Sequence, residues 1–177
     1  MSDIDEVYFE KRRDGERVFD ASLLRRPLSS LHTRAPLVFS VKDTTTQAMR
    51  AMQHEHRGCV VVTEDGTARS RLSGIFTERD VLLRIIDRGR NPANLTLGEI
   101  MTQDPECLHC DASVAWALNK MEVGGFRHVP VVDDGGRPTM VISVRDIVQY
   151  LVSAFPEEVL NLPPEFGGSY FATRDGA

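Results

Sequence analysis

The sequence is poor in cysteine, in aromatic residues and in long apolar runs. Its 177 residues include three cysteines and one tryptophan, and aromatic residues make up 7% of the chain. Three cysteines are too few, and odd in number, for the disulfide framework of a small secreted protein, so we expect a reducing compartment. No apolar run approaches the roughly 20 residues that cross a bilayer, and the charged first residues contain no apolar signal segment. These absences predict a cytoplasmic protein with no membrane partner.

Positive charge is also in short supply. The 21 lysines and arginines are outnumbered by 26 aspartates and glutamates, and the formal net charge is −5. Proteins that bind nucleic acid usually present a basic face to the phosphate backbone, so the composition argues against a nucleic-acid partner. The hydrophobic fraction of 41% and the charged fraction of 27% are those of an ordinary globular protein. We therefore expect one domain of usual size or two small ones sharing a core.

An internal repeat organises most of the chain. With an offset of 69 residues, the segment that begins at Pro27 aligns with the one that begins at Thr96, and nine positions up to Gly66 are identical. Chance predicts roughly two or three such identities at average residue usage. After Gly66 the first copy has three extra residues, so the offset becomes 66. The chain divides into an N-terminal arm (1–26), a first repeat (27–92), a second repeat (93–154) and a C-terminal tail rich in Pro and Gly (155–177).

Hydrophobic periodicity predicts the same order of elements, β-α-β-β-α, in both copies. We expect strands over 37–41, 59–62, 72–76, 107–110, 128–132 and 139–143, and helices over 43–54, 78–88, 113–123 and 144–154. A unit of about 60 residues is marginally stable alone, because it buries too little of its surface. The two copies are therefore predicted to pack sheet against sheet as one pseudo-symmetric α+β (α/β) domain.

Each copy carries a hydroxyl residue, any residue, an arginine and an aspartate where a strand runs into a helix. The two patterns are Thr77-x-Arg79-Asp80 and Ser143-x-Arg145-Asp146. One interpretation is a capping box, in which the hydroxyl and the carboxylate satisfy backbone amides at the start of the helix. Aspartate is shorter than the usual Glu or Gln of that box, so the cap is expected to be imperfect.

The alternative interpretation of these two turns is a ligand site. The start of a helix has unsatisfied amides and a partial positive charge, which suit an anion. An arginine adds a planar fork of donors for phosphate oxygens, and an aspartate offers two acceptors for the hydroxyls of a ribose. Together these groups match a ribose phosphate, and the pattern occurs twice.

Several segments, taken in order, resemble the cystathionine-β-synthase (CBS) domain. GIFTERD and MVISVRD resemble the end of that domain, while GEIMTQDP, CDASVAWALNKM and FRHVPVVDDGG resemble its start, first helix and second strand. The resemblance covers residues 27–154 and implies a tandem pair, also called a Bateman module. Such modules are regulatory sensors that hold adenine nucleotides in clefts between the two copies.

The resemblance implies a role for each matching residue. The side chains form like pairs: Asp80 and Asp146 for ribose hydroxyls, Thr77 and Ser143 for phosphate or ribose, Arg79 and Arg145 for phosphates, and Thr33 and Thr102 beside the ligand. The backbone positions that would meet the adenine edge are Gly58, Cys59, Arg127 and His128. Two departures from the family pattern leave open whether both clefts bind equally well. The first copy has Val61 where the second has the more usual Pro130, and the second copy has Met140 where the first has Gly74.

The resemblance also sets expectations about partners. It implies an adenosyl ligand (AMP, ADP, ATP or S-adenosylmethionine) bound as a regulator and not as a cofactor, a homodimer, and a separate effector protein of unknown identity. A structural scaffold that binds no ligand is the alternative. An enzyme is disfavoured, because the sequence has no nucleophile elbow, no zinc-protease motif and no phosphate-binding loop.

A C-x-x-C motif with an internal histidine spans Cys107 to Cys110. It aligns with apolar strand positions of the first copy, and residues three apart on a strand point to opposite faces. We therefore expect two small buried cysteines without a metal. A metal or redox site remains the alternative.

Overall fold

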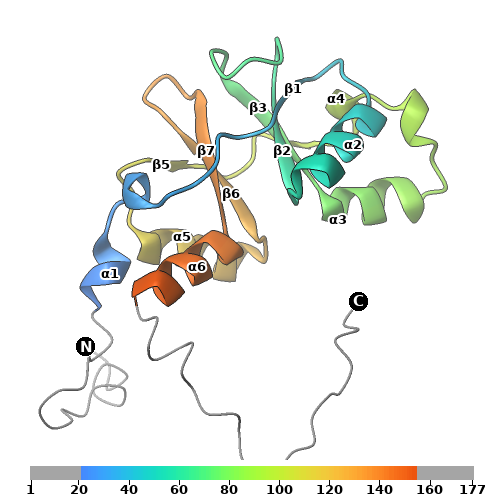
Figure 1. Ribbon diagram of the computed structural model, residues 1–177. Helices are drawn as coiled ribbons and strands as arrows, with labels where there is room; N and C mark the ends of the chain where they lie inside the picture. Colours follow the sequence, from blue (N-terminus) through green and yellow to red (C-terminus); the bar gives the residue numbers. More distant parts are fainter. Residues whose placement is uncertain (1–20, 155–177) are drawn as a thin grey trace, which may run out of the picture.

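The computed structural model describes residues 21–154, so the C-terminal tail and most of the N-terminal arm lie outside the described residues. Two sheets form the centre of the structure (Figure 1). The first sheet contains, in spatial order, β1 (Val38–Ser40), β2 (Cys59–Thr63), β3 (Leu72–Thr77) and β4 (Thr102–Gln103). The second contains β5 (Leu108–His109), β6 (His128–Val132) and β7 (Pro138–Ser143).

The two sheets repeat one pairing scheme. In each copy the first strand runs parallel to the second, and the second runs antiparallel to the third. Both antiparallel pairs contain a register shift near the end of the second strand, between Val62 and Thr63 and between Val131 and Val132. The order of elements predicted from periodicity is confirmed in both copies.

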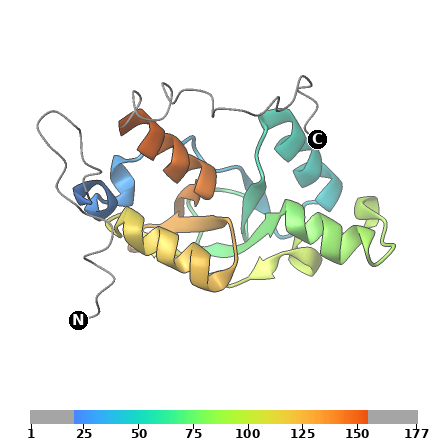
Figure 2. The ribbon, with the colours of Figure 1, turned by 90° about the horizontal axis from the view of Figure 1, so that it is seen from below.

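Helices flank the two sheets. They are α1 (Ser22–Arg25), α2 (Thr45–Glu55), α3 (Glu78–Asp80), α4 (Leu97–Ile100), α5 (Val114–Gly124) and α6 (Val144–Ala154), with short 3₁₀ turns at η1 (Leu28–Ser30) and η3 (Pro92–Asn94). Figure 2 shows α2 and α6 along one side of the sheets and α3 and α5 along the other. The helix predicted over 78–88 continues from α3 as a π-helical turn, η2 (Val81–Ile86), in which the amide of Asp87 donates to the carbonyl of Leu82. This wider winding was not predicted.

The segments that begin the two copies are exchanged between the two cores. Leu28 and Leu31, at the start of the first repeat, lie in the core formed around β6 and α5 of the second. Leu97 and Ile100, at the start of the second repeat, lie in the core formed around β2 and α2 of the first. Because each copy completes the hydrophobic core of the other, neither core is whole without both parts of the chain.

The two sheets also share apolar side chains. Val141 of β7 packs in one buried cluster with Cys59, Val61 and Ile75 of the first sheet. This cluster joins the copies face to face, as predicted from the small size of each repeat. The α+β fold with two pseudo-symmetric repeats is therefore confirmed.

One local prediction is wrong. Cys107 is exposed and Cys110 is half-buried, whereas both were expected to be buried strand residues. The reason is that β5 is only two residues long, and the chain turns directly after His109. Cys59 in β2 is the buried cysteine among the described residues.

Candidate functional site: a cleft between the two repeats

Both strand-to-helix turns form complete capping boxes. The Oδ2 atom of Asp80 accepts hydrogen bonds from the backbone amide and the hydroxyl of Thr77, each at 2.8 Å. The Oδ2 atom of Asp146 accepts the same pair from Ser143, at 2.7 and 2.6 Å. The shorter aspartate side chain therefore closes the box in both copies. Because only one oxygen of each carboxylate is used, the other remains able to accept from a second partner.

Asp80 has found such a partner in Arg84, one helical turn further on. Its Oδ1 atom lies 3.2 Å from Nε of Arg84, and the same guanidinium donates to the carbonyl of Ile100 and, at 3.1 Å, to the hydroxyl of Thr102. Arg84 thereby connects the turn of the first copy to the start of the second. Arg84 was not among the predicted site residues, although its spacing of four from Asp80 is a sequence signal for such a pair.

A cavity of about 500 Å³ opens beside this turn. It is lined by residues of both copies, and seven of the twelve predicted site residues line it: Gly58, Thr77, Arg79, Asp80, Thr102, Arg127 and His128. Apolar surface comes from Ile75, Leu83, Phe126 and Pro130. A cleft with apolar walls and a few converging polar groups is the usual form of a small-molecule site.

The two copies are in close contact where His128 faces Gly58. A Cβ atom at position 58 would lie 2.8 Å from Cε1 and Nε2 of the His128 ring, so a larger residue could not be accommodated without movement. Burial lowers the pKa of His128, while the nearby carboxylate of Glu78 opposes that shift. The imidazole is therefore uncharged at neutral pH.

Arg79 also crosses from one copy to the other. One of its terminal nitrogens donates to the carbonyl of Gly125 at 2.9 Å, and the side chain is otherwise exposed. Arg127 is exposed on the opposite wall of the cavity. The cleft thus has a cationic group on each side, one from each repeat.

The other five predicted residues do not line this cavity: Ser143, Arg145, Asp146, Thr33 and Cys59. Two of them, Asp146 and Cys59, interact electrostatically with Arg57. Arg57 donates to the carbonyl of Ala35 at 2.8 Å, and its pKa is lowered by burial and by the charge of Arg34, with Asp146 opposing. Burial also raises the pKa of the Cys59 thiol to about 12, so this cysteine is not a thiolate.

Thr33 lies beside the Met140 departure noted in the sequence. Its hydroxyl is 3.7 Å from the sulfur of Met140. The first copy has Gly74 at that position, and a Cβ atom there would lie 2.3 Å from the sulfur of Met101. A methionine thus lies next to both positions, but beside Gly74 it is Met101, whereas at the matching position it is Met140 itself. The two sites therefore differ in shape.

Two mixed α and β repeats with a ligand-sized cleft between them define the class of protein: a paired-repeat α+β domain. The chain belongs to the CBS domain family, whose pattern it matches twice, over residues 28–87 and 97–153. It is a tandem CBS pair, the Bateman module that the resemblance implied. Among residues 21–154, no helix combines the length and apolar character needed to cross a bilayer.

Known proteins support this assignment. The chain is 34% identical over 130 residues to the mitochondrial CBS domain-containing protein CBSX3 of Arabidopsis thaliana, an alignment that covers 72% of this chain and 62% of that protein. A CBS domain protein from Pyrobaculum aerophilum, solved in complex with AMP, has a TM-score of 0.62 and 24% identity, with coverage of 72% and 98%. A CBS domain pair solved with 5′-methylthioadenosine and S-adenosylmethionine has a TM-score of 0.63 and 20% identity, with coverage of 72% and 97%.

Proposed function

We propose that this protein is a regulatory module that binds an adenosyl compound in the cleft between its two repeats. The observation that carries the proposal is the cavity of about 500 Å³ that Thr77 and Asp80 of the first repeat share with His128 of the second. The complexes of similar CBS proteins with AMP and with S-adenosylmethionine support this ligand class. The role is regulatory and not catalytic.

Each group in the cleft has a part in this recognition. Asp80, already fixed by Thr77 and Arg84, would accept from the ribose hydroxyls through its carboxylate. Arg79 and Arg127 would meet the phosphates or another anionic group. Ile75 and Phe126 supply apolar surface for a purine ring, and the backbone near Gly58 and His128 would meet its edge.

We propose a second, weaker site around Ser143, Arg145 and Asp146. The Ser143 turn repeats the geometry of the Thr77 turn. The electrostatic contact between Asp146 and Arg57 provides charges of both signs there. The hydroxyl of Thr33 and the backbone of Cys59 complete the proposed set.

Ligand binding is relayed as a change in the relative orientation of the repeats. A ligand that touches both copies favours the arrangement in which both contacts are made, so binding shifts the population toward it. A homodimer would carry this change to an effector protein. We propose that the two chains of the homodimer meet through exposed apolar side chains of η2 and α5: Leu82, Leu83, Ile86, Trp116 and Val123.

Titration calorimetry of the purified chain with AMP, ADP, ATP and S-adenosylmethionine tests the proposal. We expect at least one of the four to bind and to raise the melting temperature. Asp80→Ala should abolish the tighter binding, whereas the matched change Asp146→Ala should leave it in place. If none of the four compounds produces heat or a rise in melting temperature, the protein is a structural scaffold and the proposal is wrong.

A further inference from the structure

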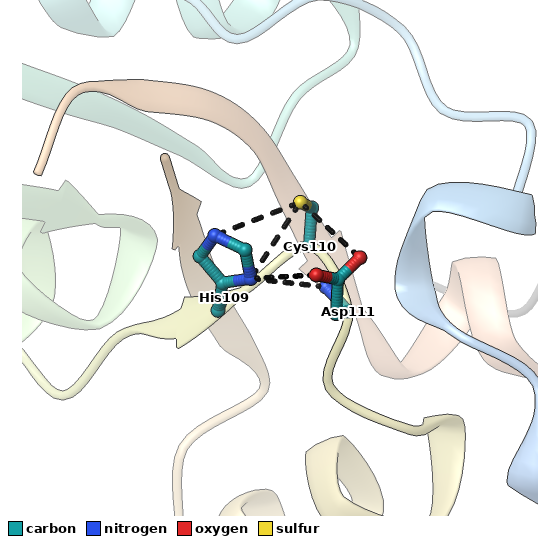
Figure 3. A group of neighbouring side chains, drawn as sticks. All are labelled: His109, Cys110 and Asp111. Carbon is teal, nitrogen blue, oxygen red and sulfur yellow. Dashed lines mark hydrogen bonds and ion pairs between the residues drawn. The ribbon is translucent and has the colours of Figure 1, made fainter. Parts of the chain in front are cut away.

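Three consecutive side chains converge at the turn between β5 and α5, away from the nucleotide cleft. They are His109, Cys110 and Asp111, and Figure 3 shows them facing one another. A tight turn causes this, because the amide of Ala112 donates to the carbonyl of His109 at 3.0 Å. In an extended strand, neighbouring side chains would point to opposite faces and could not meet.

The distances between the polar atoms match those around a tetrahedral metal ion. Nδ1 of His109 lies 3.7 Å from the sulfur of Cys110 and 3.4 Å from Oδ2 of Asp111, while the sulfur lies 3.8 Å from Oδ1 of Asp111. Zinc bonds of about 2.0–2.3 Å in tetrahedral geometry place ligand atoms about 3.3–3.6 Å apart. The spacing of the three groups therefore suits one ion, and a rotation of the His109 ring would aim Nδ1 at it.

The neighbours of the histidine favour the tautomer of a metal ligand. Its Nε2 atom lies 3.1 Å from a carboxylate oxygen of Asp134, and its Nδ1 atom accepts from the amide of Asp111 at 3.4 Å. The tautomer that satisfies both neighbours carries its proton on Nε2 and leaves Nδ1 unprotonated, as a metal ligand requires. The sulfur of Cys110 lies above the ring face, 3.7 and 3.9 Å from the two ring nitrogens, so the ring must rotate for Nδ1 and the thiolate to share an ion. A carboxylate that holds the second nitrogen in this way is typical of metal-binding histidines.

The first repeat provides an internal comparison. Its equivalent turn has the same hydrogen bond, from the amide of Asp43 to the carbonyl of Ser40, also at 3.0 Å. The aligned residues there are Ser40, Val41 and Lys42. The fold therefore builds this turn without any metal ligands, so the His-Cys-Asp set of the second copy is not needed to form it.

We propose that His109, Cys110 and Asp111 bind one zinc ion, with water in the fourth position and Asp134 as the outer carboxylate. A thiolate with an imidazole selects zinc over the hard cations magnesium and calcium. Position 109 pairs with Val132 at the end of β6, whereas Pro130 of the same strand lines the cleft. The two sites are thus separated by about 7 Å of strand, at about 3.3 Å per residue.

Cobalt substitution tests the proposal on the full chain, freed of metal and kept reduced. We expect one equivalent of Co²⁺ to produce a thiolate charge-transfer band and the intense visible bands of tetrahedral coordination, and one equivalent of Zn²⁺ to remove both. Cys110→Ser should abolish the charge-transfer band, whereas the matched control Cys107→Ser should retain it. Asp134→Asn should keep the spectrum and weaken Zn²⁺ binding by about 10- to 100-fold.

A second variant separates metal binding from folding. Replacing His109 by Ser and Cys110 by Val transfers the residues of the first repeat, so it should fold normally and bind neither ion. The proposal is overturned if the wild-type chain shows no thiolate band, or if the band survives Cys110→Ser and is lost in Cys107→Ser. Nucleotide titration of the double variant should match that of the wild type. A failure of the zinc proposal can therefore be distinguished from a failure of the proposed adenosyl site in the cleft.

Discussion

The two repeats build the same turn but place it in different electrostatic surroundings. In the first, Asp80 is 7% exposed and forms an ion pair with Arg84, which also holds Thr102. In the second, the residue aligned with Arg84 is Tyr150, whose hydroxyl instead donates to the carbonyl of Leu23 at 3.3 Å. Among the residues that the structure describes, Asp146 has no ion pair within 4 Å.

The opposite walls of the two sites differ as well. Phe126 and His128 face the Thr77 turn across the first cleft, and the residues aligned with them beside the Ser143 turn are Arg57 and Cys59. One site thus has an aromatic ring where the other has a partly buried guanidinium. The lesson is that a repeat can keep its backbone and its helix cap while its binding properties diverge, because binding depends on the side chains that the other copy supplies.

The largest effect should come from removing the two aspartates in turn. Asp80→Ala deletes a helix cap and removes the ion-pair partner of Arg84, whose side chain is 43% exposed, and we expect it to cost about 2–3 kcal/mol of unfolding free energy. Asp146→Ala deletes only a cap, so about 0.5–2 kcal/mol is expected. Urea unfolding measures both values. Equal losses of unfolding free energy in the two variants would show that the ion pair between Asp80 and Arg84 does not stabilise the protein.

A smaller effect is expected where the repeats differ in packing. Gly74→Ala would place a methyl group 2.3 Å from the sulfur of Met101 and 2.9 Å from the carbonyl oxygen of Thr102, so overpacking should cost about 1–3 kcal/mol. Met140→Ala, at the matching position, removes a partly exposed side chain and should cost less. Thermal unfolding of both variants tests this order, and a more damaging Met140→Ala would reverse our account of how the two halves are filled.

The smallest effect concerns pH. Burial lowers the pKa of His128 in the folded state below the ordinary histidine value of 6.5. As the pH falls through that value, the unfolded chain therefore binds more protons than the folded chain, and the free energy of unfolding decreases. His128→Gln should remove this part of the pH dependence while keeping a polar side chain. Unfolding free energies measured between pH 5 and pH 8 provide the test, and an unchanged slope in the variant would contradict it.

Much of the fold could be predicted because the signals are local. The strands follow from β-branched runs, and the start of α3 follows from a hydroxyl three residues before an aspartate. The winding of η2 and the short β5 could not be predicted in this way. β5 begins only at Leu108, which leaves Cys107 outside the strand, and its early end turns His109, Cys110 and Asp111 toward one another, against the expectation of buried cysteines.

Part of the site was equally out of reach of local pattern. The partner of Asp80 could have been found from its spacing, since Arg84 lies one helical turn away. The link from Arg84 to Thr102, and the position of His128 against Gly58, join residues that are distant in the chain. Periodicity contains no information on such contacts, because they depend on how the two repeats pack.

The sequence by itself determined that there are two copies of one unit, what elements each contains, and where a carboxylate closes the start of a helix, since these depend on residues within a few positions of one another. The tertiary structure alone decided that the opening segments are exchanged, that Thr77 faces His128 across a cleft, and that the side chains of His109, Cys110 and Asp111 gather at one turn. The physical reason is that burying apolar surface lowers the free energy wherever two surfaces pack closely. Which surfaces pack closely depends on the whole folded chain and not on neighbouring residues.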